Sequence, residues 1–109
     1  MEATGSDVEG GVRTVVVKIG SSSLTDERGA IDEAAVAKVC DEIAGVRAAG
    51  SRVVAVSSGA IAAGLPVLGL ADDRPRDAVT LQAVSAVGQS RLMGVWDRHL
   101  AGHGLVGGQ

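Results

Sequence analysis

The stretch Thr14–Gly20, T-V-V-V-K-I-G, decides the fold class of this 109-residue chain. It is an unbroken β-branched run that ends at a glycine, which is typical of a strand buried on both faces of a parallel sheet. An amphipathic pattern follows, from Asp32, which suits a helix N-cap, to Gly50, which suits the residue that ends a helix. A second short apolar run, Val53–Val56, comes directly after it. Strand, helix and strand in this order predict a βαβ unit with two parallel strands.

The segments on either side of this unit are less regular. Residues 1–11 carry three acids and no apolar run, and we predict a loose, flexible N-terminal tail there. After the second strand we expect a short helix at Gly59–Gly64, a loop at Leu65–Arg76, a long helix from Asp77 towards His99 and the beginning of a third strand at Gly104–Gln109. Gly88 is expected to kink the long helix or to divide it in two.

The composition excludes several classes of function. A net charge of −3 and a pI near 5.2 leave no basic surface for nucleic acid or an anionic membrane. With no Phe, no Tyr and one Trp, stacking on bases cannot be the main mode of binding. Val53–Ala71 carries no charge, but Ser, Gly and Pro interrupt it, so no transmembrane helix is expected. Cys40 is the single cysteine and is expected to be a buried, inert thiol. The first residues do not form a secretory signal, and together these two features favour the cytoplasm.

Two small polar loops, Gly20–Ser23 and Ser57–Ala60, follow the two predicted strands. The ends of parallel strands meet at one edge of a sheet, where ligands of open α/β folds bind. Backbone N–H groups and serine hydroxyls in such loops bind anions, and glycine allows a close approach. Lys18 stands one residue before the first loop. Its simplest interpretation is a strand-end lysine that reaches water, but beside two anion-binding loops a fixed ammonium suits phosphoryl transfer.

Other chemistries have less support in the sequence. Neither G-x-x-x-x-G-K-[ST] nor G-x-G-x-x-G after the first strand occurs. His99 and His103 have helical spacing but no third metal ligand at a suitable distance, and we expect them at the surface. Asp72–Asp73 is expected to be a solvated part of a loop. Ser57 and Ser58 have no apparent general base, so a serine nucleophile is not predicted.

Three segments carry a resemblance to a known family: V-V-V-K-I-G-S-S-S-L-T at Val15–Thr25, V-S-S-G-A-I-A-A-G at Val56–Gly64 and A-V-G-Q-S-R-L-M at Ala86–Met93. In this order they resemble the N-terminal part of the glutamate-phosphorylating enzymes of the amino acid kinase family. The resemblance implies an α/β fold, in which residues 12–109 are the glutamate-binding, N-terminal portion of a three-layer αβα domain with a mainly parallel sheet. Domains of that family are considerably longer, so we expect these residues alone to be inactive.

The resemblance also implies a reaction, which is the ATP-dependent phosphorylation of the side-chain carboxylate of L-glutamate, assisted by Mg²⁺, at the start of proline biosynthesis. That carboxylate is already ionised at neutral pH and needs no general base to attack the γ-phosphorus. The matching residues are Lys18 for catalysis and phosphate binding, Gly20 and Ser21 for the ATP phosphate loop, and Ser58, Gly59 and Ala60 for the substrate. No residue of the chain is expected to bind a metal.

Two further interpretations remain open. The chain could belong to another member of the same family that acts on a different carboxylate or phosphate. It could also be a non-catalytic α/β module that binds an anion or pairs with another chain through an exposed sheet edge. The partners implied by the resemblance are L-glutamate and ATP, without nucleic acid or membrane, and the longer enzyme is expected to form a homo-oligomer.

Overall fold

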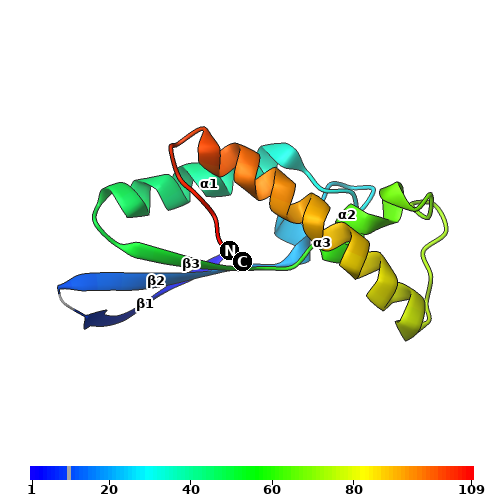
Figure 1. Cartoon of the computed structure of the whole chain (residues 1–109), viewed down its shortest axis with the longest axis horizontal. Coiled ribbons are helices and arrows are strands. Elements are labelled where there is room, and N and C mark those ends of the chain that lie inside the picture. Colours follow the sequence, from blue (N-terminus) through cyan, green and yellow to red (C-terminus); the bar gives the residue numbers. More distant parts are fainter. Residues whose placement is uncertain (10) are drawn as a thin grey trace.

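The computed structural model describes residues 1–9 and 11–109, and the side chains of residues 1–5 and 11–109. A sheet of order β1-β2-β3 carries α1 and α3 on one face, while α2 lies beyond the end of the strands (Figure 1). The elements are β1 (Glu2–Glu9), β2 (Val12–Ile19), the 3-10 turn η1 (Ser21–Ser23), α1 (Glu33–Ala48), β3 (Arg52–Ser57), α2 (Ala60–Val67) and α3 (Ala78–Ala101). The predicted α/β class is confirmed.

The central βαβ unit has the predicted form. Residues 14–19 of β2 pair in parallel with residues 52–57 of β3, and α1 connects the two strands. The helix begins where the sequence predicts, because the Asp32 carboxylate accepts hydrogen bonds from the backbone N–H groups of Ala34 and Ala35 at 3.0 and 3.3 Å. Gly50 follows its end with a φ of +97°, a conformation that costs glycine little. Local signals therefore determine both ends of this helix.

The core lies between the sheet and the helices. Its buried members are Val17, Ile19, Leu24, Val36, Val39, Cys40, Ile43, Leu92 and Trp96. The opposite face of the sheet is open in the described residues, where Val54 and Val56 are about half exposed, at 50% and 49%. In β2 itself Val16 is only half-buried and Lys18 is exposed, so the prediction that this first strand is buried on both faces is wrong, because the described helices cover only one face of the sheet.

The predicted loose tail is wrong for residues 2–9, which form β1 antiparallel to β2. Glu2 lies opposite Lys18 and Thr4 opposite Val16, with an irregularity between Gly5 and Val8. Strand pairing uses main-chain groups, so it can recruit a segment whose side chains show no apolar alternation. The sheet of the described residues consequently has one antiparallel and one parallel pair of strands. Gly10, also part of the predicted tail, lies outside the described residues.

The helices α2 and α3 differ from the prediction in extent. The short helix continues through Pro66 to Val67 and so takes in the first residues of the predicted loop. The predicted division into two helices at Gly88 is wrong, since α3 runs without interruption from Ala78 to Ala101. Gly88 is buried because α2 crosses it, and a Cβ there would overlap the backbone of Ala60. This glycine allows two helix backbones to touch.

The last residues form no strand. After α3, Gly104 has a φ of +71°, and residues 105–109 have no regular structure, so the predicted third strand is wrong. Leu105 packs against the core, and the segment returns across the helical face towards the sheet (Figure 1). No helix among the described residues is both long and apolar enough to span a membrane.

Candidate functional site

Of the predicted site residues, Lys18, Gly20 and Ser58 meet at the ends of β2 and β3, whereas Ser21, Gly59 and Ala60 lie outside the lining of the pocket there. This pocket has a volume of about 270 Å³ and is lined by Lys18, Ile19, Gly20, Val56, Ser57 and Ser58. The parallel register explains this arrangement, because Lys18 is opposite Val56 and Ile19 opposite Ser57, so both strands end at the same level. The loop that leaves β2 and the loop that leaves β3 consequently form opposite walls of one small pocket.

Two hydrogen bonds join these loops. The backbone N–H of Ser58 donates to the Ile19 carbonyl oxygen at 3.3 Å, which extends the parallel ladder by one residue. The hydroxyl oxygens of Ser21 and Ser58 lie 2.8 Å apart and share a hydrogen bond. Both residues are exposed. The structure thus brings together Ser21 and Ser58, which are 37 residues apart in the sequence.

Lys18 presents its side chain on the side of β2 away from the core. Its neighbours Val17 and Ile19 are 5% and 2% exposed, whereas Lys18 itself is exposed. Within the described part of the chain its ammonium has no hydrogen bond and no ion pair. The strand therefore holds the stem of Lys18 at the pocket while its charge remains open to an anionic ligand.

Gly20 leaves the backbone open on the same side. A Cβ at this position would meet nothing within 4 Å, so a ligand can approach the main chain of this loop closely. The η1 turn that follows is anchored by Leu24, which is fully buried, and by a hydrogen bond of 2.8 Å from the Thr25 hydroxyl to the Ser21 carbonyl oxygen. Sequence reasoning did not single out Leu24 and Thr25 as supports, although they directly follow the three serines.

Gly59 makes the turn from β3 into α2. It has a φ of +117° and is buried, with the side chains of Ile31 and Leu92 against it. A Cβ there would stand 3.3 Å from Ile31 Cδ1 and 3.7 Å from Leu92 Cδ1. Ala60 then begins the helix, whose first N–H groups have no acceptor within the helix and can bind an anion. Ile31 and Leu92 are further supports that the sequence did not reveal.

The two histidines contact acidic side chains of α1, His99 from α3 and His103 from the turn that follows it. His103 Nε2 lies 2.7 Å from Asp41 Oδ1, and His99 Nε2 lies 3.3 Å from Glu33 Oε1. Arg98 donates to the same Glu33 oxygen at 2.6 Å, and this hydrogen bond is the main reason why the pKa of Glu33 is lowered. Nowhere in the described residues do three His, Cys, Asp or Glu side chains gather to hold a metal ion.

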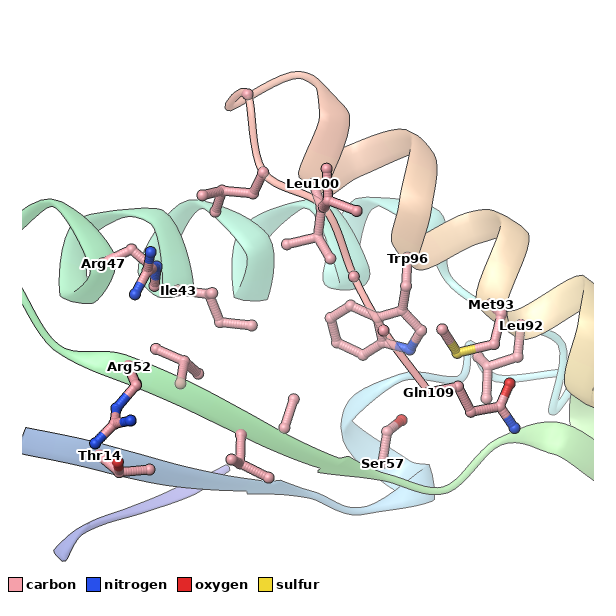
Figure 2. Close-up of a pocket in the computed structure, with 18 of the residues that line it drawn as sticks. Thr14, Ile43, Arg47, Arg52, Ser57, Leu92, Met93, Trp96, Leu100 and Gln109 are labelled. Atoms are coloured by element: carbon pink, nitrogen blue, oxygen red, sulfur yellow. The ribbon is translucent and has the colours of Figure 1, made fainter.

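A larger cavity of about 910 Å³ lies on the helical side of the sheet and is shown in Figure 2. The Trp96 ring and Leu100 project into it from α3, while Arg47 and Arg52 stand at its far end. Ser57 lines both this cavity and the smaller pocket. Its hydroxyl, however, donates to the carbonyl oxygen of Ser58 at 2.8 Å, and this hydrogen bond stabilises the backbone of the loop.

Comparisons with known proteins agree on one family. The model of the amino acid kinase family matches residues 13–109. The glutamate 5-kinase of Salinispora arenicola is 53% identical over 97 residues, which are 89% of this chain and 26% of that enzyme. The glutamate 5-kinase of Pelobacter propionicus is 47% identical over 94 residues, 86% of this chain and 25% of that enzyme. The chain thus spans about a quarter of the length of these curated relatives.

Proposed function

The chain belongs to the amino acid kinase family, and from this we propose that it carries the phosphate loop and the glutamate-binding loop of an ATP-dependent kinase that phosphorylates the side-chain carboxylate of L-glutamate. One observation supports the proposal above all. The loop after β2 and the loop after β3 form one pocket, which Lys18, Gly20 and Ser58 help to line, and the Ser58 hydroxyl lies 2.8 Å from that of Ser21, which is outside the lining. Relatives 47% to 53% identical over this stretch are named glutamate 5-kinases.

The phosphate side of the proposed site is built from β2. A carboxylate oxygen of glutamate attacks the γ-phosphorus, the bond from phosphorus to the bridging oxygen breaks, and ADP leaves with that electron pair. The attacking group is already an anion at neutral pH, so the reaction needs no general base. What it needs is cationic compensation for two anions brought together, and the Lys18 ammonium supplies this beside the backbone of Gly20 and Ser21.

The glutamate side is built from the end of β3 and the start of α2. In this proposal the Ser58 hydroxyl and the N–H groups of Gly59 and Ala60 donate to glutamate. ATP brings Mg²⁺ on its phosphates, and we assign the cation no ligand here, since the described residues have no suitable group of carboxylates. We also propose that residues 12–109 are the N-terminal part of the kinase domain, and that the enzyme is a cytoplasmic homo-oligomer at the first step of proline biosynthesis.

The test is an assay for acyl phosphate. The protein as its gene encodes it is incubated with ATP, Mg²⁺ and L-glutamate, and the product is trapped with hydroxylamine. In parallel, residues 13–109 replace the matched segment of the Salinispora arenicola enzyme, and this chimera is assayed in the same way. We expect hydroxamate that depends on both ATP and glutamate. A chimera that prefers another carboxylate or a phosphate would overturn the glutamate specificity, and a chimera that folds and binds but does not turn over would favour the non-catalytic module.

A further inference from the structure

The polar groups of Ser58 are almost fully used within the protein. Its N–H donates to Ile19, its carbonyl oxygen accepts from the Ser57 hydroxyl at 2.8 Å, and its own hydroxyl pairs with Ser21. The hydroxyl proton is the only donor of Ser58 that a ligand can still receive, because the N–H already donates to Ile19, while the bond to Ser21 uses only one of the hydroxyl's three hydrogen-bonding sites. Any ligand that Ser58 binds through a donated hydrogen bond must therefore receive the hydroxyl proton.

The direction of the Ser21–Ser58 bond then follows from a count of protons. An ionised carboxylate only accepts hydrogen bonds, so Ser58 must give its single proton to the substrate in order to bind it. The bond of 2.8 Å to Ser21 can persist only if Ser21 Oγ–H is the donor and Ser58 Oγ the acceptor. If Ser58 donated to Ser21 instead, it would present a lone pair to the carboxylate, and the contact would be repulsive.

We propose that Ser21 is a positioning residue, whose hydroxyl donates to Ser58 Oγ and thereby directs the Ser58 proton at the carboxylate of the substrate. This inference rests on the proposed function, since it takes the ligand of Ser58 to be an anion. Ser21 is well placed for this task. Its carbonyl oxygen accepts hydrogen bonds from the Thr25 hydroxyl at 2.8 Å and from the Leu24 N–H at 3.0 Å. Because Leu24 is fully buried, these bonds fix the backbone of Ser21 to the core.

The backbone and the hydroxyl of Ser21 then have different roles. Its backbone stays in the loop that faces the phosphates, but its hydroxyl proton is committed to Ser58 and is not free for a phosphate oxygen. Loss of the hydroxyl should consequently weaken the binding of glutamate and leave ATP unaffected. A hydroxyl that bound phosphate directly would do the reverse. The same bond ties the glutamate loop to the phosphate loop before either ligand arrives.

The kinetic test compares Ser21→Ala, Ser58→Ala and the double variant, in the gene-encoded protein and in the chimera. We expect Ser21→Ala to raise the KM for glutamate about tenfold, the effect of weakening one hydrogen bond to a charged group, with the KM for ATP unchanged. The double variant should be no worse than Ser58→Ala, since Ser21 acts only through Ser58. Ser21→Thr keeps the hydroxyl and should restore the KM. A raised KM for ATP, or effects that multiply in the double variant, would overturn the proposal.

Ser22→Ala is the matched control, because Ser22 is an exposed neighbour in the same turn whose hydroxyl has no hydrogen bond in the described part of the chain. A second readout does not depend on activity. In the 109-residue chain, Ser21→Ala should shift the amide resonances of Ser58 to Ala60 and speed their hydrogen exchange, and Ser22→Ala should not. Unchanged amides in Ser21→Ala would refute the link. If the gene-encoded protein and the chimera were both inactive while the amides shifted, the proposed function would be rejected and the link between the loops would stand.

Discussion

Gly88 of α3 lies directly against Ala60 of α2, so that a Cβ on the glycine would overlap the Ala60 carbonyl oxygen. Gly64 makes the reciprocal contact, where a Cβ would overlap the carbonyl oxygen of Val84. Ala60 is the first residue of α2 and follows the loop that carries Ser58. The close crossing of the two helices thus determines the position of the loop that carries Ser58, although neither glycine belongs to the candidate site.

The substitution Gly88→Ala is therefore expected to destabilise the protein and displace α2. Adding a methyl group to a tightly packed core costs roughly 1–3 kcal/mol, and here the obstacle is backbone, which cannot rotate away. Gly94→Ala is the matched control in the same helix, since a Cβ there meets nothing within 4 Å and removal of the glycine favours the helix. Urea unfolding should give a lower midpoint for Gly88→Ala and an equal or higher one for Gly94→Ala. Equal midpoints for Gly88→Ala and the parent would contradict the close crossing.

Gly59→Ala tests whether the turn into α2 depends on a left-handed glycine. Its φ of +117° strains any residue with a Cβ, at about 1–3 kcal/mol, and Ile31 leaves little room. Gly69→Ala provides the comparison, because Gly69 has a φ of +70° but open space around it. Both variants should lose stability in urea, but only Gly59→Ala should raise the KM for glutamate. An equal rise of the KM for glutamate in Gly69→Ala would mean that this KM responds to any loss of stability and not to the turn at Gly59.

Much of the fold could be predicted because its signals are local. Asp32 and Gly50 act on their own helix ends, and the two strands pair in parallel because a helix connects them, which brings the Gly20 and Ser58 loops together. The errors concern contacts between distant segments. Gly88 looks like a helix breaker until its neighbour Ala60 is known, and β1 pairs through its main chain without an apolar pattern. The Ser21–Ser58 bond likewise depends on two loop conformations that no spacing encodes.

The pairing of Glu33 with Arg98 should make stability depend on pH in the acid range. The Arg98 hydrogen bond is the main cause that holds the pKa of Glu33 below its ordinary value of 4.5. A lowered folded-state pKa stabilises the protein above the unfolded-state pKa, and this contribution is lost as the pH falls through the folded-state value. The Tm of the parent should exceed that of Glu33→Gln near neutral pH, and the two should converge in acid. The pair is exposed, so added salt should shrink the difference. A gap that persists in acid would argue against the ion pair.

Cys40 should resist alkylation in the folded protein. It is fully buried, and burial raises the pKa of its thiol to about 11, so very little thiolate exists near neutral pH. Iodoacetamide should label the chain slowly in buffer and rapidly in denaturing urea, as followed by mass spectrometry. In Gly88→Ala the rate in buffer should rise if the helices separate. Fast labelling of the native parent would show that the core beneath α1 is open.

Lys18 offers the sharpest test of the proposed chemistry. Its charge has no partner within the described residues, so its removal should leave stability nearly unchanged. In the chimera, Lys18→Ala is expected to reduce kcat by about 100-fold or more, the scale known for one donor that stabilises transition-state charge. Lys18→Arg should recover only part of this loss, because the planar guanidinium places its charge differently. Lys38→Ala removes an exposed lysine from α1 and serves as the control with matched charge. If neither Lys18→Ala nor Lys38→Ala changed kcat, Lys18 would have no catalytic role and would be a strand-end lysine that reaches water.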